Sequence, residues 1–135
     1  MISSSLEETI AFAENFAKEL SVKDIVALDG NLGAGKTSFV QGLAKGLGVS
    51  TKQYVRSPTF SLLNIYQGDT PLYHFDFYRL TEKTQFADLG FEEYFDGNGI
   101  CVIEWANLFP EMLPARTKQL HFKLIDESTR EIIVR

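Results

Sequence analysis

Residues 24–37 read Asp-Ile-Val-Ala-Leu-Asp-Gly-Asn-Leu-Gly-Ala-Gly-Lys-Thr. The first part, Asp24 to Asp29, is a short apolar run of the kind that forms a strand buried on both faces of a sheet. The second part, Gly30 to Thr37, meets the pattern G-x-x-x-x-G-K-[ST] of a phosphate-binding loop. A strand that runs straight into such a loop predicts a nucleotide site at the end of that strand.

The loop has the chemistry that a polyphosphate requires. Glycine has no Cβ, so the backbone can wrap closely around phosphate oxygens and aim successive N–H groups at them. The helix that follows adds the positive end of its dipole. The residues expected to contact the nucleotide are Asn31, Leu32, Gly33, Ala34, Gly35, Lys36, Thr37 and Ser38.

Two side chains of the loop have separate tasks. Lys36 is expected to place a positive charge beside the β- and γ-phosphates, and the Thr37 hydroxyl is expected to ligate the Mg²⁺ that bridges them. These positions predict binding of ATP with Mg²⁺. Hydrolysis needs more, namely a carboxylate on the metal side and a group that orients water.

Glu104 is the candidate for the metal-side carboxylate. It ends the apolar run Ile100 to Ile103, which is how a Walker-B acid is presented at the carboxyl end of a central strand. The alternative interpretation is an acid that ends a strand in solvent and has no ligand.

Asp76 is the candidate for the water side. It lies in the stretch Tyr-His-Phe-Asp-Phe-Tyr-Arg, residues 73–79, where alternation along a strand predicts His74, Asp76 and Tyr78 on one face. The alternative is that Asp76 is a structural partner of Arg79 or His74.

A third segment, residues 55–60, reads Val-Arg-Ser-Pro-Thr-Phe and lies between the loop and the next strands. In other P-loop proteins a segment in this position senses the γ-phosphate, so Ser57 or Thr59 could reach the nucleotide or its metal ion. An ordinary Ser-Pro turn is an equally good interpretation of these residues.

The rest of the chain predicts a mixed α/β fold. Ser5 and Glu8 form a capping-box pattern before an amphipathic helix over 6–20. A second helix follows Thr37 and ends near Gly48. The other expected elements are a hairpin over 61–67 and 72–80, one or two short helices over 84–95, a strand over 99–105 and a terminal hairpin over 120–125 and 131–135. This order indicates a P-loop NTPase-like, mainly parallel sheet with helices on both faces and a C-terminal hairpin.

Composition limits the range of functions. The chain has 135 residues, 44% of them hydrophobic, which predicts one domain over residues 1–135. Its net charge is −5 and its five arginines are dispersed, so a direct grip on a nucleic-acid backbone is not expected. No membrane span or leader is evident in the sequence, which predicts the cytoplasm. The single cysteine, Cys101, is expected to be a buried core thiol.

Four blocks of sequence together resemble one known family. They are Gly-Asn-Leu-Gly-Ala-Gly-Lys-Thr at 30–37, Val-x-Ser-Pro-Thr-Phe at 55–60, His-x-Asp-x-Tyr-Arg-Leu at 74–80 and Ile-Glu-Trp at 103–105. In this order and spacing they look like the TsaE (YjeE) family of bacterial tRNA threonylcarbamoyladenosine biosynthesis proteins. The resemblance covers nearly the whole chain.

The resemblance implies a cytoplasmic ATPase that acts on the TsaD and TsaB proteins, which place threonylcarbamoyl on adenosine 37 of tRNAs that read codons beginning with A. The chain would meet tRNA only through that complex, and the partners would stimulate hydrolysis. The implied roles are metal binding for Thr37 and Glu104, water activation for Asp76, a position beside the site for Trp105, and an adenine-side contact near Thr9.

Two other functions share the same loop. A small-molecule P-loop kinase would transfer the γ-phosphate to a metabolite, but such enzymes carry a lid with paired arginines. A nucleotide-dependent binding module would change shape with ATP and turn over negligibly. In this chain the arginines are dispersed and little length is left for a lid, which disfavours the kinase. The presence of Asp76 and Glu104 favours hydrolysis over the binding module.

Overall fold

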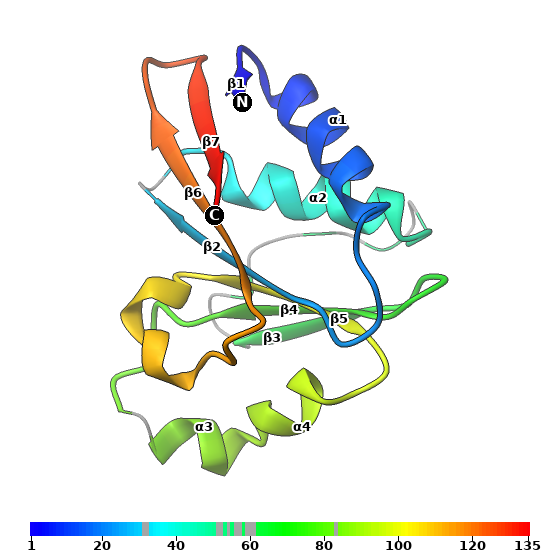
Figure 1. The fold of residues 1–135 in the computed structure, drawn as a ribbon, viewed down its shortest axis with the longest axis vertical. Coiled ribbons are helices and arrows are strands. Elements are labelled where there is room, and N and C mark those ends of the chain that lie inside the picture. The colour runs from blue at the N-terminus through cyan, green and yellow to red at the C-terminus, as the bar shows by residue number, and fades with distance from the viewer. Residues whose placement is uncertain (31–32, 51–52, 54, 56–57, 59–61, 83) are drawn as a thin grey trace.

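The described residues form a seven-stranded sheet with β2 (Ile25–Gly30) at its centre (Figure 1). The computed structural model describes residues 1–30, 33–50, 53, 55, 58, 62–82 and 84–135. The other strands are β1 (Ile2–Ser3), β3 (Leu63–Tyr66), β4 (Leu72–Asp76), β5 (Ile100–Glu104), β6 (Lys118–Leu124) and β7 (Arg130–Val134). The helices are α1 (Leu6–Ala17), α2 (Lys36–Gly46), α3 (Thr84–Leu89), α4 (Phe91–Phe95) and two 3₁₀ turns, η1 (Ala106–Leu108) and η2 (Pro110–Met112).

The strand order is β1-β7-β6-β2-β5-β4-β3. The central strands β6, β2, β5 and β4 are parallel, whereas β3 at one edge and β7 and β1 at the other pair antiparallel. The predicted mixed α/β sheet and its C-terminal hairpin, now β6 and β7, are confirmed. The parallel strands β2, β4 and β5 end at the same edge, where open α/β sheets bind their ligands.

Helices cover both faces of the sheet, as predicted (Figure 1). Val26 and Leu28 of β2 join the core under α1 and α2, and Ile25 and Ala27 join the core under α3 and α4. Successive side chains of a strand point to opposite faces, so β2 contributes to two cores at once. This is why its sequence is continuously apolar and does not alternate.

The helices α1 and α2 approach closely at Gly42. A Cβ added there would lie 2.3 Å from the carbonyl oxygen of Ile10 and 2.6 Å from the Cβ of Ala13. On the sheet side of α2, Phe39 packs edge-on against Phe122 of β6 with 5.5 Å between ring centroids. The helix that follows the glycine loop is thereby fixed between α1 and the sheet.

The second core consists largely of phenylalanine rings. Phe75 packs edge-on against Phe91, and Phe77 against Phe86, each pair with 4.8 Å between centroids. Cys101 lies in the same core at 1% exposure, and burial raises the pKa of its thiol to about 12. The prediction of a buried core thiol is confirmed.

The first helix is shorter than predicted. It ends at Ala17 and not at Leu20, because the Leu20 N–H donates to the Ala17 carbonyl at 3.1 Å and closes a turn. The predicted cap is present, since the Glu8 N–H donates to the Ser5 hydroxyl at 3.1 Å. Strand β1 and both 3₁₀ turns were not predicted. None of the helices in the described part of the chain is long and apolar enough to cross a membrane.

The strand over 72–80 was predicted too long. β4 ends at Asp76, whose Oδ1 accepts the Tyr78 N–H at 2.9 Å in a side-chain turn. The alternation therefore stops before Tyr78, and the prediction that Tyr78 shares a strand face with His74 and Asp76 is wrong. The predicted short helices after this turn are confirmed as α3 and α4.

The Gly42 contact leads to a first prediction. Gly42→Ala should lower the free energy of unfolding by about 1–3 kcal/mol, because the added methyl group overpacks the α1–α2 contact by more than the higher helix propensity of alanine restores. Urea unfolding would measure the change, with Lys123→Ala at an exposed position of β6 as a control. A variant at least as stable as the wild type would show that α1 moves aside freely.

Candidate nucleotide-binding site

The glycine loop joins β2 to α2 in a conformation that needs glycine. Gly30, Gly33 and Gly35 have φ values of 135°, 80° and 96°, a region that other residues rarely adopt. A Cβ on Gly30 would also lie 2.1 Å from the Phe122 carbonyl oxygen of β6. Asn31 and Leu32, two predicted nucleotide contacts, lie outside the described residues.

The first turn of α2 is open to a ligand. Its N-cap is Gly35, which has no side chain and therefore makes no capping hydrogen bond. The first N–H groups of a helix have no partner within the helix and attract anions. This end of α2 therefore has the geometry of a phosphate site, as the loop sequence predicts.

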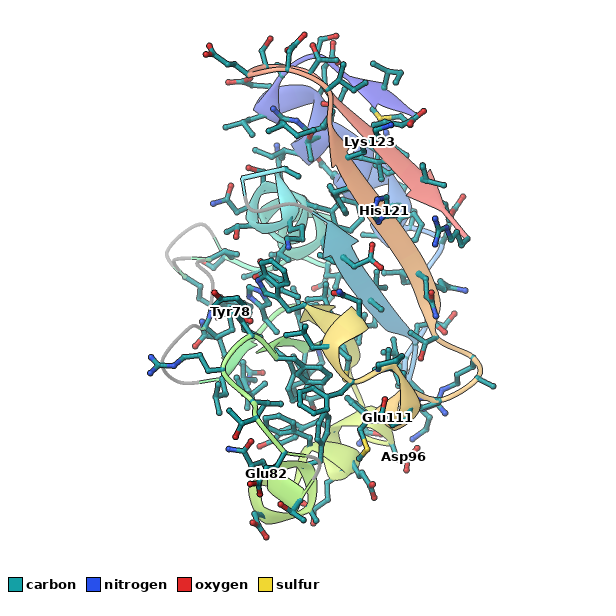
Figure 2. All side chains as sticks on the ribbon, turned by 90° about the vertical axis from the view of Figure 1, so that its left-hand side faces the viewer. Tyr78, Glu82, Asp96, Glu111, His121 and Lys123 are labelled. Atoms are coloured by element: carbon teal, nitrogen blue, oxygen red, sulfur yellow. The ribbon has the colours of Figure 1, made fainter. Side chains whose placement is uncertain are left out.

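A pocket of about 640 Å³ opens at this helix end. It is lined by Leu6, Gly33, Gly35, Lys36, Thr37, Ser38, Asp76, Tyr78, Glu104 and Trp105. The sequence predicted most of these residues, and the fold brings them together from α1, the loop, β4 and β5. Tyr78, one of the lining residues, is 59% exposed (Figure 2).

Lys36 is buried at the base of the pocket, with 5% of the residue exposed. Its Nζ donates to the Gly30 carbonyl at 3.0 Å and lies 3.7 Å from the centroid of the Trp105 ring. Burial lowers the pKa of this ammonium group, although the carboxylates of Glu104, Asp76 and Asp29 oppose the shift. An arriving phosphate would supply the negative charge that this buried cation favours.

The two predicted carboxylates lie side by side at the ends of neighbouring strands. Asp76 of β4 is directly opposite Glu104 of β5 in the parallel register. Both are buried. Glu104 Oε1 accepts from the Thr37 hydroxyl at 3.4 Å, and its other oxygen, Oε2, lies 2.6 Å from Nε2 of His74. The alternative that Glu104 is a solvated strand-end acid is therefore wrong.

The oxygen atoms near Thr37 fit a magnesium–nucleotide complex. The Thr37 hydroxyl and the Glu104 carboxylate are both hard oxygen donors on one side of the pocket. Within the described residues, no cluster of three or more His, Cys, Asp or Glu side chains could hold a metal ion unaided. Mg²⁺ suits this arrangement, because it binds proteins through one or two side chains and takes its other ligands from phosphates and water.

Other predicted contacts are placed differently or remain untested. The Thr9 hydroxyl is buried 2.7 Å from the Ser3 hydroxyl and does not line the pocket, so its adenine-side role stays a prediction. Leu6 of the same helix does line the pocket. Ala34 is buried in the core beneath the loop. The predictions for Ser57 and Thr59 fall outside the described residues.

Arg130 was missed by the sequence predictions. It is 3% exposed at the start of β7, and its Cδ and Nη1 lie 3.2 Å from the place of a Cβ on Gly35. Its Nη2 donates to the Ser128 carbonyl at 3.2 Å, while Nε and Nη1 are buried without a hydrogen-bond partner among the described residues. A buried cation with two unused donors thus lies against the phosphate loop. Arg130 alternates with the buried Ile132 along the strand, and this pattern in the sequence could have indicated that Arg130 is buried.

The chain is similar to one protein family over nearly its whole length. The family described as "Threonylcarbamoyl adenosine biosynthesis protein TsaE" matches residues 3–132. The tRNA threonylcarbamoyladenosine biosynthesis protein TsaE of Bacillus subtilis (strain 168) is 44% identical over 127 residues, covering 93% of this chain and 78% of that protein. The protein of the same name from Treponema pallidum (strain Nichols) is 40% identical over 133 residues, covering 98% and 97%.

A solved structure has a similar fold. The crystal structure of Bacillus subtilis YdiB superimposes with a TM-score of 0.84 at 38% sequence identity, and the match covers 99% of this chain and 82% of that one. The similarity in sequence and the similarity in fold therefore extend over the same residues.

Arg130 provides the second prediction. Arg130→Met should weaken binding of inorganic pyrophosphate by about 10-fold or more, because a charged hydrogen bond contributes about 1.5–3 kcal/mol. The free energy of unfolding should stay within about 1 kcal/mol of the wild-type value, since replacing a buried ion by an apolar chain removes a desolvation penalty. Calorimetry and urea unfolding measure the two quantities.

The exposed Arg135 offers a matched control, because Arg135→Met makes the same change outside the site. A variant of Arg130 that loses stability but binds pyrophosphate normally would assign this arginine a purely structural role.

Proposed function

This chain belongs to the TsaE family of threonylcarbamoyl adenosine biosynthesis proteins, and from that membership we propose that it binds ATP with Mg²⁺ and hydrolyses the γ-phosphate. One observation carries the proposal: Lys36, Thr37, Asp76 and Glu104 converge on a single pocket at the start of α2. A glycine turn without a ligand would not need Lys36, Asp76 and Glu104, three charged and buried side chains, beside it.

The chain's own residues divide the chemistry among them. The loop amides, Lys36 and Arg130 would hold the phosphates, and Thr37 with Glu104 would hold Mg²⁺. When bound, Mg²⁺ neutralises charge on the β- and γ-phosphate oxygens. Asp76 orients the attacking water and accepts its proton. As the oxygen of water bonds to the γ-phosphorus, the bond from that phosphorus to the bridging oxygen breaks, and ADP and phosphate result.

We further propose that the cycle serves tRNA threonylcarbamoylation through the TsaB and TsaD proteins in the cytoplasm. The net charge of −5 and the dispersed arginines support a role in which this chain meets tRNA only within that complex. Residues 1–135 act as one domain in this proposal, because strands from both ends of the chain, β1 and β7, pair in one sheet.

The third prediction tests activity and partners together. The wild-type chain should bind ATP in calorimetry, and purified TsaB with TsaD should increase phosphate release. Lys36→Ala should lower that stimulated rate by about 100-fold, the loss typical when one preorganised electrostatic donor is removed. Lys45→Ala removes an exposed lysine from the same helix and should leave the rate unchanged.

The outcomes separate the rival functions. Phosphate transfer to a metabolite in place of water would identify a kinase, and tight ATP binding with no stimulated turnover would identify a nucleotide-dependent binding module. Failure of the folded chain to bind ATP at all would remove the basis of the proposal.

The fourth prediction separates the two carboxylates. Asp76→Asn should keep ATP affinity but slow turnover by about 100-fold or more, because a general base contributes that much. Glu104→Ala should keep some ATP binding in EDTA but lose the hydrolysis that depends on Mg²⁺. Steady-state phosphate release over a range of Mg²⁺ concentrations, with Asp88→Asn on the exposed side of α3 as the control, would measure both effects.

Either role can fail independently of the other. Normal turnover in Asp76→Asn would exclude Asp76 from water activation, and an unaltered Mg²⁺ dependence in Glu104→Ala would exclude Glu104 from the metal.

A further inference from the structure

His74 is a polar residue in an apolar part of the sheet. It is fully buried on β4, on the face covered by α1 and α2. Its neighbours on that face, Leu72 of the same strand and Ile100 and Val102 of β5, all belong to the apolar core. Burying an imidazole among such residues costs free energy unless a hydrogen bond compensates. The burial of His74 at this position therefore requires an explanation.

The His74 ring has one hydrogen-bond partner among the described residues. Nε2 lies 2.6 Å from Oε2 of Glu104, whereas Nδ1 is buried with no partner among the described residues. A carboxylate that binds a metal ion is ionised and can only accept, so in that state Nε2 is the donor of this bond. This bond is not needed to join β4 to β5, because the parallel ladder from Leu72 to Asp76 already joins the two strands.

The two carboxylate oxygens of Glu104 have different partners. Oε2 is held from behind by His74, and Oε1 faces the Thr37 hydroxyl at 3.4 Å. A glutamate side chain has three torsions, and the bond to His74 helps to fix the last of them, which orients the carboxylate, before a metal ion arrives. Hydrogen bonds behind a metal ligand are the usual means by which proteins fix such a ligand beforehand.

We propose that His74 is a positioning residue that holds the Glu104 carboxylate so that Oε1 faces the magnesium ion of the bound nucleotide. This inference rests on the proposed function, because it concerns the same Mg²⁺–ATP site. His74 touches neither the nucleotide nor the reacting water. His74 acts only through Glu104. Its loss should therefore change nucleotide affinity only when the metal is present.

Calorimetry with a non-hydrolysable ATP analogue tests the proposal without using turnover. Each chain is titrated twice, once in EDTA and once in saturating Mg²⁺. For His74→Leu we expect affinity in EDTA to stay within about twofold of wild type. In Mg²⁺ it should fall by about 10-fold or more, the loss typical when the partner behind a metal ligand is removed. His74→Gln, whose amide nitrogen reaches about as far as Nε2, should restore most of that loss.

Two further variants exclude a general effect of a disturbed core. Phe75→Leu alters the next residue of β4, which faces the opposite core, and should leave both affinities unchanged. His74→Asn keeps a polar amide at the position but is too short to reach Glu104, so it should behave like His74→Leu. If His74→Leu does not fold, the comparison of the Gln and Asn variants decides the question alone.

The results separate this proposal from the function on which it rests. If wild type gains affinity from Mg²⁺ and the Leu or Asn variant gains as much, the role of His74 is overturned while the nucleotide site stands. Equal losses in EDTA and in Mg²⁺ would also overturn it, because they would show general damage. A wild-type chain that binds no nucleotide would overturn both proposals at once.

Discussion

The close contact between Gly30 and β6 is the constraint on which the rest of the site depends. At this point β2 ends against the Phe122 carbonyl with no room for a side chain, so β6 can pair with β2 up to the first residue of the loop. The C-terminal hairpin is thereby held beside the loop. Its second strand begins with Arg130, which reaches Gly35 from below. A residue 100 positions from Gly30 thus comes to lie against the glycine loop through backbone packing.

The parallel register of β4 and β5 is the second determinant. It places Asp76 opposite Glu104, while the turn from β2 delivers Lys36 and Thr37 to the same pocket. The resulting group combines a buried ammonium with two buried carboxylates before any ligand is bound. Such a group is costly to the fold in isolation, and this cost is the general mark of a site arranged for a charged ligand.

Much of this arrangement could be predicted from the sequence because its signals are local. The loop, the strand before it, the cap of α1 and the terminal hairpin are each encoded in one continuous stretch of the sequence. The contacts of Arg130 and His74 could not be predicted, because each depends on which strands become neighbours in space. The end of β4 was misplaced for a related reason: the apolar pattern continues to Leu80, but the Asp76 side chain captures the Tyr78 N–H and turns the chain.

The position of Cys101 has a practical consequence for work on this chain. It is the only cysteine, it lies in the phenylalanine-rich core, and its thiol is held protonated far above neutral pH. Maleimide dyes require an accessible thiolate, so the folded chain is in effect already free of reactive cysteine. A fluorophore or spin label directed to a newly introduced surface cysteine, for example in place of the exposed Lys123 (Figure 2), would report from that site alone, with the native residue left in place.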